Sequence, residues 1–218
     1  DGAANFAADV TFADGADIIT ASAGTSNFRA GVNAGNSIES GGNYNTVVGD
    51  EAGTAITTGD QNVAIGYAAL DANTTASNNT GVGYLALGAN TTGFSNTAFG
   101  SRSGDAITTG DYNTAVGNLA LSAETTGAQS VAIGHGALAS QNSTSSADMF
   151  NTAVGASSGA AITTGVQNTF IGGLAGDANT TANNNTAVGY ASLSTNTTAT
   201  NNTAVGSESL TANTSGAQ

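Results

Sequence analysis

A glycine that returns at every seventeenth position constrains this chain more than any other feature of its sequence. The series comprises Gly49, Gly66, Gly83, Gly100, Gly117, Gly134, Gly155, Gly172, Gly189 and Gly206, with a single longer step between Gly134 and Gly155. A fixed period of this length is typical of solenoids and other repeat arrays, in which each unit buries its apolar side against its neighbours. The sequence therefore predicts a stack of equal coils and argues against an ordinary globular enzyme.

Composition supports an ordered chain and argues against two classes of partner. Hydrophobic residues make up 39% of the 218 residues, Pro is absent and only 8% are charged, unlike a charged disordered segment. The formal net charge of -13 argues against nucleic acid, which needs a basic footprint, and disfavours anionic lipid. No run of about 18 apolar residues occurs, so we expect no membrane insertion.

The residues before each repeat glycine predict a short strand. The string is N-T-A-V-G or a close variant, with Asn at its start in nine of the ten repeats. Alternate residues of a strand share a face, so the β-branched residue and the apolar residue lie together, and the small residue between them faces the other way. We expect the Ala face to pack closely against partner chains, the Asn side chains to form ladders between coils, and the glycine to turn the corner.

The residues after each glycine take two alternative forms. In one, Leu stands four residues after the glycine and Asn three further on, as in Leu70 and Asn73; in the other, Gly and Ile take those places, as in Gly104 and Ile107. Because cores penalise both voids and overpacking, this exchange predicts that the two sites share one narrow interior. The coil of Gly172 has Gly176 and Asn179 at these two positions and so lacks the large aliphatic residue, and we expect Leu174 to fill its interior instead.

A Thr-Thr pair follows, and it predicts a second strand with one Thr facing inward and one facing solvent. One repeat is long enough for two short strands and two turns. The predicted fold class is all-β, a parallel β-solenoid of about 10 to 11 coils.

Two domains are predicted: residues 1–26, a non-repeat strand or cap segment, and residues 27–218, the repeat domain, which stops in mid-repeat. Four extra residues fall within 139–150, and insertions in repeat arrays often map to the binding face. This segment is our candidate receptor-contact loop, with a tolerated bulge as the alternative. The residues of the candidate loop are Ser143, Thr144, Asp148, Met149 and Phe150.

No catalytic, metal or cofactor site is predicted. His135, the only histidine, follows a repeat glycine where Tyr stands in other coils, which favours an exposed turn residue. Asp71, Asp105 and Asp177 share a column but lie in separate coils, too far apart for one cation, and the spacing of calcium-binding β-rolls is missing. Arg29 and Arg102 are interpreted as surface residues.

The strands N-V-A-I-G at 62–66 and S-V-A-I-G at 130–134 resemble the head repeats of trimeric autotransporter adhesins. The longer unit N-T-A-V-G-Y-A-S-L-S-T-N-T-T at 185–198 resembles the repeat arrays of bacteriophage tail fibres. The likeness covers residues 27–218 and implies a left-handed parallel β-roll and a homotrimer. The adhesin repeat is shorter than the repeat of this chain, which therefore departs from it in the second half of the coil.

The resemblance implies a structural and adhesive segment of a tail fibre or surface adhesin, extracellular or carried on a virion, without enzymatic activity or cofactor. A host-surface glycan or protein is the expected receptor class. Two alternatives remain at this stage. Stacked Thr columns suggest an ice-binding β-solenoid, and the solenoid fold also occurs in polysaccharide-cleaving enzymes, although the acids here are scattered singly.

Overall fold

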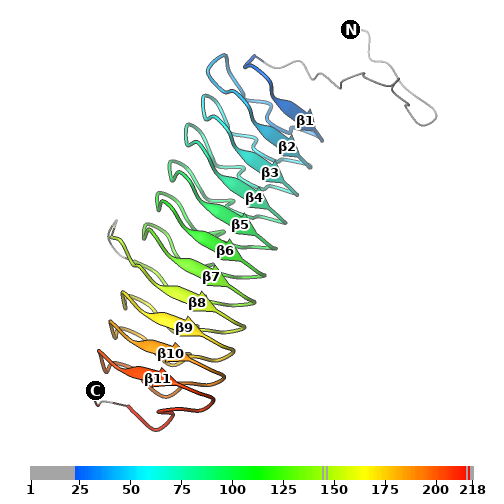
Figure 1. Ribbon diagram of the computed structural model, residues 1–218. Helices are drawn as coiled ribbons and strands as arrows, with labels where there is room; N and C mark the ends of the chain where they lie inside the picture. The colour runs from blue at the N-terminus through cyan, green and yellow to red at the C-terminus, as the bar shows by residue number, and fades with distance from the viewer. Residues whose placement is uncertain (1–22, 144, 146, 215, 217–218) are drawn as a thin grey trace, which may run out of the picture.

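The chain folds into an elongated parallel β-solenoid in this computed structural model, which describes residues 23–143, 145, 147–214 and 216 (Figure 1). Eleven strands of three residues form one sheet, each paired only with the strands before and after it in sequence. They are β1 (Phe28–Ala30), β2 (Thr46–Val48), β3 (Val63–Ile65), β4 (Thr80–Val82), β5 (Thr97–Phe99), β6 (Thr114–Val116), β7 (Val131–Ile133), β8 (Thr152–Val154), β9 (Thr169–Ile171), β10 (Thr186–Val188) and β11 (Thr203–Val205).

The register of the sheet follows the period of the sequence. Thr46 pairs with Val63, and Val63 pairs with Thr80, so each residue meets its equivalent in the next repeat. The predicted parallel β-solenoid, with about 10 turns and ~17 residues per turn, is confirmed. Of the predicted N-terminal domain, residues 1–22 lie outside the described part of the chain.

The middle residue of each strand from β2 to β11 points into the coil. This column is buried and consists of Val47, Ala64, Gly81, Ala98, Ala115, Ala132, Ala153, Phe170, Ala187 and Ala204. The prediction that the Ala face packs against partner chains is therefore wrong, because that face lines the interior of its own chain. A small residue suits most of these positions, since the large apolar side chain of the coil comes from its other side.

In eight of the described coils, one large side chain from either of the two predicted sites is fully buried in the interior. Those that are fully buried are Ile56, Leu70, Leu87, Ile107, Leu121, Leu138, Ile162 and Leu193. A Cβ added to Gly104 would lie 3.0 Å from Ile107 Cδ1, and one added to Gly53 would lie 2.8 Å from Ile56 Cδ1. The two sites thus occupy one space, as the exchange of residues predicted.

Backbone geometry explains why Gly alternates with Leu at the first of these sites. The φ angle is 52° at Leu70 and 56° at Gly104, so both residues adopt the left-handed conformation. A leucine accepts strain of roughly 1–2 kcal/mol there, which the burial of its side chain offsets by about 1.5–3 kcal/mol. A glycine avoids the strain, and the isoleucine three residues later then supplies the missing volume.

The interior of the Gly172 coil is filled by a large side chain from a third position, in the strand itself. The ring of Phe170, in the middle of β9, is fully buried, whereas Leu174 is exposed. A Cβ added to Gly176 would lie 2.6 Å from the Phe170 ring. The prediction that Leu174 fills this coil is wrong, because an aromatic side chain from the strand already occupies the space above Gly176.

Buried Asn side chains connect consecutive coils along the start of the strands. Asn96 is representative: its Oδ1 accepts a hydrogen bond from the backbone N–H of Asn113 at 2.9 Å, and its Nδ2 donates to the Gly110 carbonyl at 2.7 Å. Bonds between two Asn side chains occur at some positions, as from Asn62 Nδ2 to Asn45 Oδ1 at 3.1 Å. The predicted ladder exists, but it runs mainly from side chains to backbone groups that would otherwise be buried without partners.

The second half of the coil is not a strand anywhere in the described residues. It still bonds to the next coil, as where Ala55 N–H donates to the Asp71 carbonyl at 3.0 Å and Thr57 N–H to the Thr74 carbonyl at 2.9 Å. The Thr57 hydroxyl donates to the same carbonyl at 3.1 Å. The predicted second strand is wrong: left-handed residues flank this segment, as Gly53 before it and Gln61 after it, and no strand forms between them.

Candidate functional site

The outward side of the sheet is a continuous face built from two columns of side chains. We call it the outward face. The first residues of the strands form one column: Phe28, Thr46, Val63, Thr80, Thr97, Thr114, Val131, Thr152, Thr169, Thr186 and Thr203. The third residues form the other: Ala30, Val48, Ile65, Val82, Phe99, Val116, Ile133, Val154, Ile171, Val188 and Val205. The strand register stacks each column along the rod.

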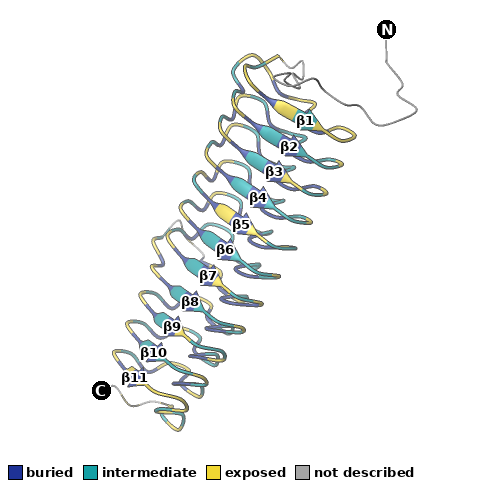
Figure 2. Cartoon of the chain, turned by 45° about the vertical axis from the view of Figure 1, so that its right-hand side comes forward, coloured by how far each residue is buried: buried dark blue, intermediate teal, exposed yellow. Residues whose placement is uncertain are grey.

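Neither column of the outward face contains a charged residue in β1–β11, although the chain carries fifteen acids and a net charge of -13. Acids occur instead on the turns, as with Asp50, Glu51 and Asp60. Large apolar side chains on the face reach solvent, with Phe99 58% and Val205 69% exposed. In Figure 2, intermediate and exposed colours appear on the strands along the whole length of the rod.

Aromatic side chains line the turns on either side of the strands. Tyr67 and Tyr84, each directly after a repeat glycine, are exposed and stack with ring centroids 5.6 Å apart. Phe94 and Tyr112, on the turn before the strand, meet edge to face at 4.9 Å. His135 is exposed in the column of Tyr67 and Tyr84, which confirms its prediction as a turn residue.

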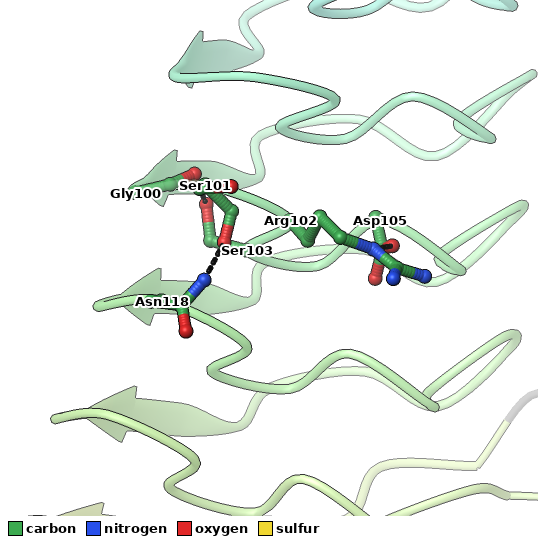
Figure 3. Close-up of polar contacts among 6 residues, drawn as sticks. All are labelled: Gly100, Ser101, Arg102, Ser103, Asp105 and Asn118. Atoms are coloured by element: carbon green, nitrogen blue, oxygen red, sulfur yellow. Dashed lines mark hydrogen bonds and ion pairs between the residues drawn. The ribbon is translucent and has the colours of Figure 1, made fainter.

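Polar contacts around Arg102 stabilise one turn and link two coils (Figure 3). Arg102 Nε donates to Asp105 Oδ2 at 2.7 Å, and this hydrogen bond raises the pKa of the Arg102 guanidinium. Asn118 Nδ2 donates to the Ser101 carbonyl of the preceding coil at 3.0 Å. Arg102 is a surface residue, as predicted. Arg29, by contrast, is only partly exposed: it pairs with Val47 and ends the interior column in β1.

In the part of the chain that the structure describes, the acids do not gather into a metal site. Burial raises the pKa of Asp71 and the pKa of Asp177 above the ordinary value, but these carboxylates belong to different coils. Across the described ranges, no group of three or more His, Cys, Asp or Glu side chains lies in a position to hold a metal ion. In the same residues, no helix is long and apolar enough to span a membrane.

The insertion between β7 and β8 is held by buried polar side chains that sequence reasoning missed. Glu124 is fully buried, and its carboxylate accepts backbone bonds from Gly127 at 2.7 Å and Ser143 at 3.1 Å. Gln141 Nε2 donates to Glu124 Oε2 and to Ser130 Oγ, both at 2.9 Å. The signal was present in the sequence, because Ser130 is the one substitution in the Asn column and directly precedes the longer step.

Gln141 also connects the Asn ladder on the two sides of the insertion. Its Oε1 accepts a hydrogen bond from Asn151 Nδ2 at 2.9 Å, so one longer side chain spans the place where Ser130 is too short. Within the candidate receptor loop, Ser143 and Met149 are buried, whereas Asp148 and Phe150 are exposed. Thr144 lies outside the described residues. Contact with a receptor stays a prediction for Asp148 and Phe150.

Comparison of the chain with protein-family models, with curated proteins and with solved structures finds no match. The functional argument therefore rests on the outward face and on the turns beside it.

Proposed function

We propose that this chain is a segment of a homotrimeric fibre, in which three copies lie side by side and bury their outward faces against one another. The left-handed sense of coiling and the threefold arrangement come from the resemblance to fibre repeats and are part of the proposal. The fibre would be extracellular, on a virion tail or a cell surface, and would serve attachment without catalysis. The observation that carries the proposal is the uncharged outward face along all eleven strands.

Charge and apolar area both favour a second copy as the occupant of this face. The third residues of the strands form an apolar column along the whole face, and exposed apolar surface of this kind on soluble proteins marks interaction sites. Because every copy carries a charge of -13, copies repel one another wherever their acidic turns meet. The outward face is the surface on which two copies approach without bringing like charges together. At about 4.8 Å per coil, the eleven strands give a rod of roughly 50 Å.

Attachment is assigned to the exposed turns, which stay accessible when the outward face is buried. The stacked Tyr67 and Tyr84, the Phe94 and Tyr112 pair, and Asp148 and Phe150 of the insertion present aromatic and polar groups for a glycan or protein receptor. Three copies in one fibre would multiply the strength of each weak contact.

The mass of the native assembly tests the trimer. We expect three times the chain mass of 20.9 kDa by native mass spectrometry. Val116→Asp places a carboxylate in the middle of the outward face and should dissociate the assembly, because three buried like charges would face one another. Thr109→Asp adds the same charge on an exposed residue outside the face and should leave the trimer intact. A monomeric native chain would contradict the proposal.

Ice binding is the second candidate, favoured by one observation. On the outward face a Thr stands two residues before a β-branched residue in most coils, on a regular array with the strand spacing. Inhibition of ice recrystallisation by the purified chain, measured on the same samples, separates the two functions. A monomer that inhibits recrystallisation would replace the fibre proposal, and a trimer without inhibition would remove the ice-binding candidate.

A further inference from the structure

In a fibre made from equal coils, little fixes the axial position of one copy relative to the next. The following inference rests on the proposed trimer. The outward face repeats with every coil, so a copy that slides by one coil meets nearly the same side chains. Sliding forfeits the contacts of a single coil at each end of the rod. A surface without distinctive features specifies register weakly, so a feature that breaks the repetition is needed.

Phe99 breaks the repetition on the outward face. It is the only aromatic residue among the third residues of β1–β11, which are otherwise Val, Ile and Ala. Its side chain is 58% exposed, whereas Val82 and Val116, its neighbours in the column, are of intermediate exposure. Within the described residues, the Phe99 ring takes part in neither of the two aromatic contacts, Tyr67–Tyr84 and Phe94–Tyr112.

The whole of β5 stands out from the neighbouring strands. Both of its outward residues, Thr97 and Phe99, are exposed, whereas those of β4 and β6 are intermediate. Only β11 and β1 at the ends of the sheet resemble it in having both outward residues exposed. In Figure 2, β5 accordingly differs in colour from the strands on either side of it. The exception thus lies inside the rod, where an end effect does not apply.

We propose that Phe99 sets the axial register of the chains in the trimer. In register, the three Phe99 rings meet at one level and fill one widened layer between the chains. After a slip of one coil, each displaced ring faces the smaller Val82 or Val116 of a neighbouring copy. That arrangement overpacks one layer and leaves a void in another, and both errors are costly in a packed interface.

Distance measurements between labelled copies test the register. The chain has no cysteine, so Thr109→Cys provides a single spin-label site outside the outward face. Electron paramagnetic resonance should give one narrow distance between copies of the otherwise native chain. In Phe99→Val we expect the mass of the trimer to persist while a second, longer population of distances appears, from copies offset by one or more coils.

Two matched variants isolate the aromatic ring as the cause. Ile65→Val trims the same column by one methyl group and should keep the single distance. Phe99→Val combined with Val116→Phe moves the ring by one coil and should restore the single distance. A single narrow distance in Phe99→Val would overturn the inference, as would loss of assembly in that variant. A monomeric native chain would instead show that the proposed trimer itself is wrong.

Discussion

Gly117→Ala is expected to disrupt the middle of the rod and to lower its free energy of unfolding by at least about 3 kcal/mol. The φ angle of Gly117 is 131°, in a region that an alanine adopts only with strain. An added Cβ would also lie 2.6 Å from the carbonyl oxygen of Gly134 in the next coil. Because the obstructing atom belongs to the backbone, the coils must separate to admit the methyl group. Thermal unfolding followed by circular dichroism measures the loss.

Gly206→Ala is the matched control for this variant. Gly206 has a similar φ of 124°, but the nearest atom to an added Cβ is Ser209 Cβ at 3.9 Å. This variant keeps the backbone strain and lacks the clash, so a loss of about 1–3 kcal/mol is expected. Equal losses in the two variants would show that the close approach between coils does not limit residue size at the repeat glycine.

Phe170→Ala is expected to cost about 3–5 kcal/mol, as for other fully buried aromatic residues. Phe170 is the large side chain of its coil, and Gly176 offers nothing to fill the space that its removal leaves. The side chain of Asn179 in the same coil is fully buried, and neither Nδ2 nor Oδ1 has a hydrogen-bond partner in the described part of the chain. A larger apolar side chain at position 179 could therefore replace the packing that is lost with Phe170.

Asn179→Ile should rescue the Phe170→Ala chain. The double variant recreates the combination of Ala98, Gly104 and Ile107, in which a small strand residue faces glycine and isoleucine. It also removes an orphaned buried amide, which costs about 1–3 kcal/mol. Asn179→Ile alone should destabilise, because its side chain competes with the Phe170 ring. A double variant no more stable than Phe170→Ala would contradict the shared interior. Denaturant unfolding of the native chain, the two single variants and the double variant gives the interaction energy of the two positions as a double-mutant cycle.

The sequence predicted most of the architecture because the interior of each coil is small and local. The position of the strand, the corner glycine and the exchange of Leu70-type for Ile107-type residues all follow from short-range geometry. The direction of the strand faces was mistaken, because β-branched and apolar residues normally face a core. Here Leu and Ile from the other side of the coil fill that core, so Ala98 faces inward and Phe99 outward.

Other features needed coordinates because they depend on pairs of distant residues. The role of Phe170 becomes clear only from its distance to Gly176, since the sequence pattern had led us to predict that Leu174 fills this coil. The contacts that Gln141 makes with Ser130 and Asn151 join residues on both sides of the insertion. The sequence locates the insertion but not its anchoring, and Ser143 and Met149, which we predicted as receptor contacts, are buried.

The constant cross-section of the rod has a genetic consequence. Most coils present the same register and one large interior side chain, whether that side chain is of the Leu70 or the Ile107 type. Outside the coils that Glu124, Ser130, Gln141 and Asn151 join across the insertion, a duplication or deletion of the codons for one repeat, between equivalent positions, therefore changes the length of the rod while the remaining coils keep the neighbours they require. The coil of Phe170 and Gly176 must be copied or lost whole, since either residue alone would leave a hole or a clash. Rods of this design can thus evolve in length by unequal recombination, one coil at a time.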